Sequence, residues 1–142
     1  MKSGRFKVAL LIDDNHIDNI INKKILENNA FVDQIMVYQS AKEALEFLKI
    51  HSSDPELFPD FILLDIRMPE MDGFGFLEEF EKLESGLKVN THIYILSSSL
   101  DPSDQRKVAE NKLVSKFICK PLTSPHLQSI QSPISHQNKP HS

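Results

Sequence analysis

The hydrophobic residues of this chain form two alternating patterns, short continuous apolar runs and longer stretches in which apolar residues recur at helical spacing. The runs lie at residues 8–12, 32–38, 61–65, 93–96 and 116–119. They are too short for buried helices, and unbroken aliphatic runs are typical of strands that are buried on both faces. The run at 32–38 also contains polar residues, so we expect it nearer the edge of the sheet.

Each of the five predicted strands is followed by a stretch that predicts a helix. Asn15, Ser40 and Asp101 are expected to cap the first, second and fourth helices, and Ser85-Gly86 to end the third. The last helix should begin at Ser124-Pro125. The residues expected to face the core are Ile17, Ile20, Ile21 and Ile25, then Ala41, Ala44, Leu45 and Leu48, then Phe76, Leu77, Phe80 and Leu83, then Val108 and Ala109, and finally Leu127 and Ile130.

Strands that alternate with helices predict an α/β fold, in which a parallel sheet with right-handed crossovers carries helices on both faces. The chain has 142 residues, of which 40% are hydrophobic and 25% charged, and this composition suits one globular domain. We expect that domain over residues 1–131. Residues 132–142 are rich in Ser, Pro, His, Asn and Gln and predict a flexible tail.

Charge and cysteine content narrow the classes of function. The formal net charge is −4 and no block of Lys or Arg is present, which argues weakly against a nucleic acid partner. The one cysteine, Cys119, excludes an internal disulfide and is expected to be buried in its strand. The apolar run at 8–12 is too short for a signal peptide or a membrane span. We therefore expect a soluble, cytoplasmic protein with no membrane partner.

Polar side chains of complementary kinds follow four of the predicted strands. Asp13 and Asp14 follow the first strand, Asp65 ends the third, Ser97 follows the fourth, and Lys120 follows the fifth. If these strands are neighbours in a parallel sheet, the side chains meet in one crevice. Crowded carboxylates are unfavourable unless a cation shares them, and an all-oxygen site suits Mg²⁺ better than zinc. A hydroxyl and a lysine opposite the metal provide what a transferring phosphoryl group requires.

These residues, in this order, resemble the receiver domain of the two-component response-regulator family. The resemblance extends from about Lys7 to Leu127 and rests on Asp13-Asp14, the run from Asp65 to Gly73, Ser97 and Lys120-Pro121. It implies a flavodoxin-like, doubly wound sheet of five parallel strands in the order 2-1-3-4-5.

The resemblance also implies a role for each matched residue. Asp65 corresponds to the phosphoacceptor, and Mg²⁺ would be held by Asp13, Asp14, Asp65 and the main-chain carbonyl of Arg67. Ser97 corresponds to the hydroxyl that bonds the phosphoryl group, and Lys120 to the lysine that pairs with it, usually through a cis bond to Pro121. Ser97 and Phe117 correspond to the switch pair. Arg67, two residues past the acceptor, could shield the aspartyl phosphate from water.

The implied partner is a sensor histidine kinase or a histidine phosphotransfer protein, and the downstream partner is not indicated. The chain resembles a single-domain receiver that is not an enzyme beyond its own phosphorylation and dephosphorylation. Such a domain would signal through the face formed by its fourth helix, fifth strand and fifth helix, and a homodimer through that face stays open.

Two alternatives remain. One is a Mg²⁺-dependent phosphatase with an aspartyl nucleophile, but hydrolases of the haloacid dehalogenase type carry a second Asp where this chain has Arg67. The other is an interaction module that works without phosphorylation, against which the full set of acidic, hydroxyl and lysine positions argues.

Overall fold

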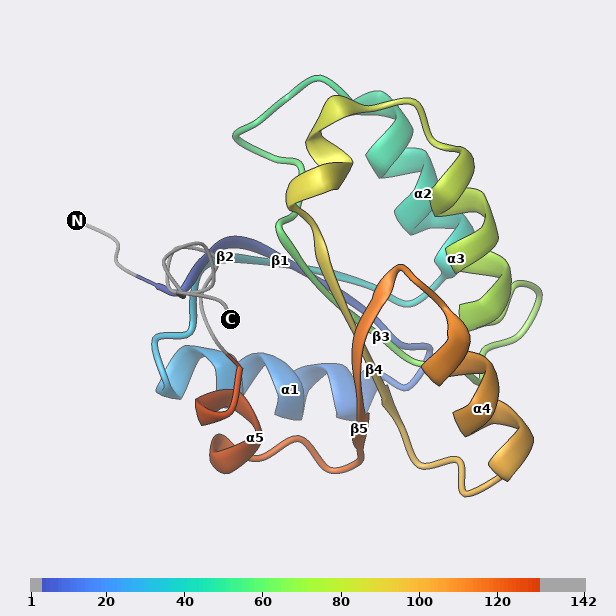
Figure 1. Ribbon diagram of the computed structural model, residues 1–142. Coiled ribbons are helices and arrows are strands. Elements are labelled where there is room, and N and C mark those ends of the chain that lie inside the picture. Colours follow the sequence, from blue (N-terminus) through green and yellow to red (C-terminus); the bar gives the residue numbers. More distant parts are fainter. Residues whose placement is uncertain (1–3, 131–142) are drawn as a thin grey trace, which may run out of the picture.

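The computed structural model describes residues 4–130, which form five strands and six helices, with one or two helices after each strand (Figure 1). The strands are β1 (Phe6–Ile12), β2 (Val32–Tyr38), β3 (Phe61–Leu64), β4 (His92–Ser97) and β5 (Val114–Cys119). The α-helices are α1 (His16–Asn28), α2 (Ala41–Ile50), α3 (Gly73–Lys82), α4 (Pro102–Glu110) and α5 (Ser124–Gln128), and η1 (Gly86–Asn90) is a 3-10 helix. The predicted tail, 132–142, lies outside the described residues.

The five strands form one parallel sheet in the order β2-β1-β3-β4-β5, which confirms the predicted fold and places β2 at an edge. Figure 1 shows α1 and α5 on one face of the sheet and α2, α3 and α4 on the other. Two hydrophobic clusters fill these layers. Leu26 and Leu127 pack in the cluster under α1 and α5, while Phe76 and Val108 belong to the one under the other three helices. No helix within residues 4–130 is long and apolar enough to span a membrane.

The predicted core face of α1 is wrong for three of its four isoleucines, whereas Ile25 is half-buried and packs against the core. Ile17, Ile20 and Ile21 are 60%, 45% and 46% exposed. The buried residues of this helix are instead Asn19, Asn22 and Leu26. The helix is therefore rotated away from the orientation that its isoleucines suggest, because Asn19 turns toward the sheet and donates a hydrogen bond of 2.8 Å to the main-chain oxygen of Asp13.

Three smaller expectations are also wrong. Ser85-Gly86 does not end α3, which stops at Lys82, because Ser85 caps η1 by accepting a hydrogen bond from the Leu87 N–H. Cys119 is exposed at the end of β5. In α4, Ala109 points outward and Asp104 is buried together with Val108. Asp104 and Val108 are four residues apart, so the inner face of α4 begins with a carboxylate.

The loop between β3 and α3 is held close to the sheet by Gly73. The Gly73 N–H donates to the main-chain oxygen of Ile66 at 2.8 Å. A Cβ at position 73 would lie 2.7 Å from the main-chain oxygen of Asp65 and 2.9 Å from the Cα of Ile66. Only a residue without a side chain fits there, so the close return of the loop onto Asp65 depends on this glycine.

We predict that Gly73→Ala lowers the free energy of unfolding by about 1 to 3 kcal/mol, because the new methyl group collides with main-chain atoms that cannot move aside. Gly86→Ala is the matched control, since a Cβ at position 86 meets nothing within 4 Å. It should leave stability unchanged or raise it by about 0.4 to 1 kcal/mol. Urea unfolding of both variants measures the difference, and equal stabilities would contradict the steric argument.

Candidate functional site

The register of the sheet brings the carboxyl ends of its central strands to one edge. Ile12 of β1 pairs with Leu64 of β3, and Leu64 pairs with Ile95 of β4. Asp13 and Asp65 follow Ile12 and Leu64 directly, so they emerge side by side. The Asp65 N–H continues the ladder by donating to the Ile12 oxygen at 3.0 Å.

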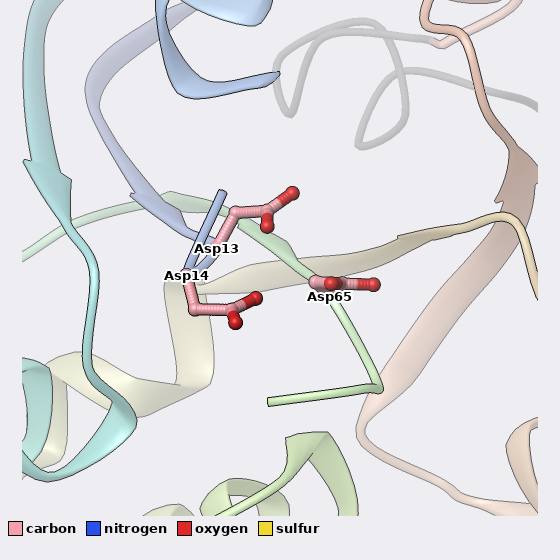
Figure 2. Close-up of side chains that lie close together, drawn as sticks. All are labelled: Asp13, Asp14 and Asp65. Carbon is pink, nitrogen blue, oxygen red and sulfur yellow. The ribbon is translucent and has the colours of Figure 1, made fainter. Parts of the chain in front are cut away.

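Three carboxylates gather at this edge. One oxygen from each of Asp13, Asp14 and Asp65 lies within 4.8 Å of the others. Figure 2 shows the three side chains around one space, with Asp13 and Asp14 at the end of β1 and Asp65 after β3. Asp13 and Asp65 are buried, whereas Asp14 is exposed. The space among them is therefore acidic and open to solvent on the Asp14 side.

Crowding changes the chemistry of Asp65. Burial, the larger cause, and the charge of Asp13 together raise the pKa of this carboxyl from 3.8 to about 6. The charge of Lys120 and hydrogen bonds from the main chain at Ile66 and Arg67 act in the opposite sense without cancelling the rise. The ionised form of Asp65 is therefore unfavourable here unless more positive charge arrives.

Lys120 supplies the positive charge present in the site. The main-chain N–H of this residue donates to the Ser97 oxygen at 3.1 Å, and the Lys120-Pro121 peptide bond is cis. Nζ lies 3.0 Å from Asp13 Oδ2 and 3.7 Å from Asp65 Oδ2. Burial alone would lower the pKa of Lys120, but hydrogen bonds to Asp18 and Asp13 and the charge of Asp65 together raise it. The ammonium group therefore stays charged.

Two residues of α1 that sequence reasoning missed, Asp18 and Asn19, support the site. Asp18 Oδ2 is the nearest acceptor to Lys120 Nζ, at 2.7 Å. Asn19 fixes the end of β1 through its bond to the Asp13 oxygen, although its own buried Oδ1 has no partner among the described residues. The available signal was the place of Asp18 in the first turn of the helix that directly follows Asp13 and Asp14.

The other predicted residues lie around this cluster. Ser97 is buried at the end of β4, and its Oγ accepts a hydrogen bond from the Ser99 N–H at 3.2 Å. Phe117 is half-buried in β5, beside Ile95, and packs against the core under α2, α3 and α4. The side chain of Arg67 does not enter the cluster but extends to α4, where it pairs with Asp104.

The donors of this cluster fit Mg²⁺. All three side chains are carboxylates, and hard divalent cations prefer oxygen ligands. The raised pKa of Asp65 shows that the cluster lacks compensating charge, which a divalent cation would provide.

Residues 9–131 match the family described as response regulator receiver domain. The chain belongs to this family. The curated relatives include a two-component response regulator from rice, Oryza sativa subsp. japonica, to which this receiver domain is 31% identical over 135 residues. That match covers 93% of this chain and 57% of the rice protein.

Solved structures show the same fold. A two-component response regulator from Cytophaga hutchinsonii superposes with a TM-score of 0.78 at 32% identity, covering 87% of this chain and 92% of that one. The receiver domain of the histidine kinase CKI1 from Arabidopsis thaliana, solved with Mg²⁺, gives a TM-score of 0.69 at 26% identity, covering 83% of this chain and 85% of that one. The acidic cluster of this receiver domain is thus of the type found in a family with Mg²⁺-bound members.

We predict that Asp65→Asn stabilises the protein in metal-free buffer near neutral pH. Because the pKa of Asp65 is raised on folding, its contribution to stability is greatest below about pH 4 and is lost as the pH rises through about 6. Removing the charge should add about 1 to 3 kcal/mol to the free energy of unfolding at neutral pH and little near pH 4.

Urea unfolding of Asp65→Asn and the wild-type protein near pH 4 and at neutral pH, with EDTA present, measures these changes in the free energy of unfolding. Glu78→Gln, which removes one exposed carboxylate from α3, is the control for the change in net charge. A gain for Asp65→Asn that does not shrink at low pH would contradict the pKa argument.

Proposed function

We propose that this receiver domain accepts a phosphoryl group on Asp65 from a phosphohistidine of a sensor histidine kinase or a histidine phosphotransfer protein, with Mg²⁺, and signals by a change of conformation. The observation that carries the proposal is the position of the Asp65 carboxylate, which is buried at a strand end beside two further carboxylates and within 3.7 Å of Lys120 Nζ.

The proposed reaction is an in-line displacement at phosphorus. An oxygen of the Asp65 carboxylate forms a bond to phosphorus as the bond to the histidine nitrogen breaks, and the imidazole leaves with that electron pair. The product is an acyl phosphate on Asp65. Asp13, Asp14, Asp65 and the Arg67 carbonyl would hold Mg²⁺. The bound ion would neutralise charge on the phosphoryl oxygens and reduce their repulsion from the acidic cluster.

Lys120 would neutralise the remaining charge of the phosphoryl group. Its raised pKa keeps it an ammonium, and its flexible stem lets Nζ move from Asp18 and Asp13 toward the phosphoryl oxygens. Ser97 would donate a hydrogen bond to one of these oxygens. Because Ser97 also accepts from Ser99, a shift of its side chain would move the loop before α4, and the half-buried ring of Phe117 would adjust in the neighbouring strand.

The exposed isoleucines of α1 support a protein partner as the phosphoryl donor. Ile17, Ile20 and Ile21 form an aliphatic surface on the helix that begins three residues after Asp13. Apolar residues grouped in this way are typical of protein interaction sites. A partner bound there would bring its phosphohistidine to the mouth of the acidic cluster.

A phosphatase is less well supported. The side chain two residues after Asp65 is Arg67, which is paired with a carboxylate of α4 and cannot serve as a general acid. We therefore propose that the domain turns over only its own phosphoryl group.

Phosphorylation tests the proposal directly. Incubation with Mg²⁺ and acetyl phosphate should give one phosphoryl adduct by intact mass spectrometry, and Asp65→Asn should give none, because the acyl phosphate forms on that carboxylate. Omission of Mg²⁺ should strongly reduce the adduct. No adduct on the wild-type chain would favour an interaction module, and repeated hydrolysis of small phosphate esters would favour a phosphatase.

We predict that Ile20→Asp reduces phosphorylation by a histidine kinase at least about ten-fold. The reason is that a substitution at a central interface residue commonly lowers the binding free energy by more than about 1 kcal/mol. Phosphorylation by acetyl phosphate should be unchanged, since a small donor does not need to dock on α1. Ile50→Asp is the control, because Ile50 is 73% exposed at the end of α2. Transfer rates are measured with any purified kinase that phosphorylates the wild-type domain, and equal effects of both substitutions would exclude a docking role for α1.

A further inference from the structure

Arg67 and Asp104 form an ion pair that links the loop after β3 to α4. Arg67 follows the predicted phosphoacceptor by two residues, and its guanidinium bonds to Asp104 Oδ2. Asp101, the N-cap of α4, lies farther from the same guanidinium, at 3.9 Å. The Asp104 side chain is 6% exposed, whereas that of Arg67 is 61% exposed. Asp104 is therefore held inside the protein, whereas most of the Arg67 side chain lies in solvent and can change its conformation.

Asp104 is also joined to the loop that carries Ser97. The Ser99 hydroxyl donates to Asp104 Oδ2 at 2.8 Å, and the Ser99 N–H donates to Ser97 Oγ at 3.2 Å. A continuous series of polar contacts thus runs from Arg67 through Asp104 and Ser99 to the hydroxyl at the end of β4. Each of the two loops beside Asp65 is connected to the same buried carboxylate.

Arg67 would have two acceptors in the phosphorylated domain, Asp104 and the phosphoryl group on Asp65. Its main chain already lies against the Asp65 carboxylate, to which it contributes a hydrogen bond. A phosphoryl group on Asp65 carries nearly two negative charges and offers three acceptor oxygens close to the base of the Arg67 side chain. The guanidinium bonds Asp104 through one terminal nitrogen, and to cover the phosphoryl group it would have to swing back toward Asp65 and away from Asp104.

We propose that Asp104 is a positioning residue that competes with the phosphoryl group on Asp65 for Arg67 and so shortens the lifetime of the phosphorylated state. This inference rests on the proposed function. Hydrolysis requires a water molecule to attack phosphorus while the Asp65 oxygen leaves with its electron pair. Arg67 bound to the phosphoryl oxygens blocks the approach of that water, and Arg67 held by Asp104 leaves it open.

The competition also connects the site to α4. When Arg67 leaves, Asp104 keeps the Ser99 hydroxyl but loses its cation, and a buried carboxylate without its cation is strongly destabilised. The first turn of α4 must then move to bring Asp104 into water. A partner that draws Asp104 outward would release Arg67 to cover the phosphoryl group and so prolong the phosphorylated state.

Two substitutions test the competition because they act in opposite directions. Asp104→Asn removes the charge that holds Arg67 but can keep the bond from Ser99, so self-dephosphorylation should slow about five-fold or more. Arg67→Ala removes the shield, so dephosphorylation should be faster than in the wild-type domain. In the double variant the Asp104 substitution should have no further effect. The phosphorylated fraction is followed by intact mass after removal of acetyl phosphate.

Matched variants separate positioning from loss of structure. Asp101→Asn makes the same charge change at an exposed residue that keeps its capping ability, and should leave the lifetime near that of the wild type. Asp104→Glu keeps the charge and should restore a lifetime close to the wild-type value. Thermal unfolding of every variant shows whether the fold is kept, and a general loosening of the fold would not move Asp104→Asn and Arg67→Ala in opposite directions.

The outcomes are distinguishable. Loss of phosphate from Asp104→Asn at the wild-type rate or faster would overturn the competition, as would a double variant that differs from Arg67→Ala. A wild-type domain that forms no adduct on Asp65 would instead contradict the proposed function and this inference together.

Discussion

The structure depends on how three carboxylates and one lysine share a small, partly buried space. Asp13 and Asp65 are buried beside each other, and burial together with their mutual repulsion raises the pKa of Asp65 to about 6. Lys120 reduces this repulsion without removing it, since it contacts Asp13 and Asp18 more closely than Asp65. The resting site therefore holds excess negative charge, which makes it receptive to a divalent cation.

The parallel sheet creates this arrangement and holds it in place against the repulsion among the carboxylates. A side chain at the end of each central strand is fixed by a ladder of main-chain hydrogen bonds that continues one residue past the strand, as at Asp65. The neighbouring loop packs so closely that Gly73 has no room for a Cβ. The strand that precedes Asp65, β3, is buried along its whole length, and the Asp65 side chain is buried at its end, facing the cluster. The stability of the core thus sustains a local electrostatic strain.

The strands and the residues at their ends could be predicted because both leave strong signals in the sequence. An unbroken apolar run such as Phe61–Leu64 has few alternatives to a buried strand, and the carboxyl ends of parallel strands must share one edge. The orientation of α1 could not be predicted in the same way. A count of apolar positions favours the isoleucine face, yet three of the four isoleucines are exposed, and Asn19 turns inward because it satisfies the oxygen of Asp13. Such a bond depends on tertiary structure and leaves no local pattern.

The two helices whose inner faces were predicted only in part, α1 and α4, are those that flank the site. Asn19 of α1 and Asp104 of α4 each occupy a buried position where helical periodicity favours an aliphatic residue. They lie on opposite faces of the sheet, and each bonds to a loop or strand end that carries a residue of the site, Asn19 at Asp13 and Asp104 at Ser99 and Arg67. A buried polar side chain is costly unless its bonds fix something in place. Departures from the hydrophobic pattern in this fold therefore mark the residues that hold the site, and those departures are more informative than the apolar positions around them.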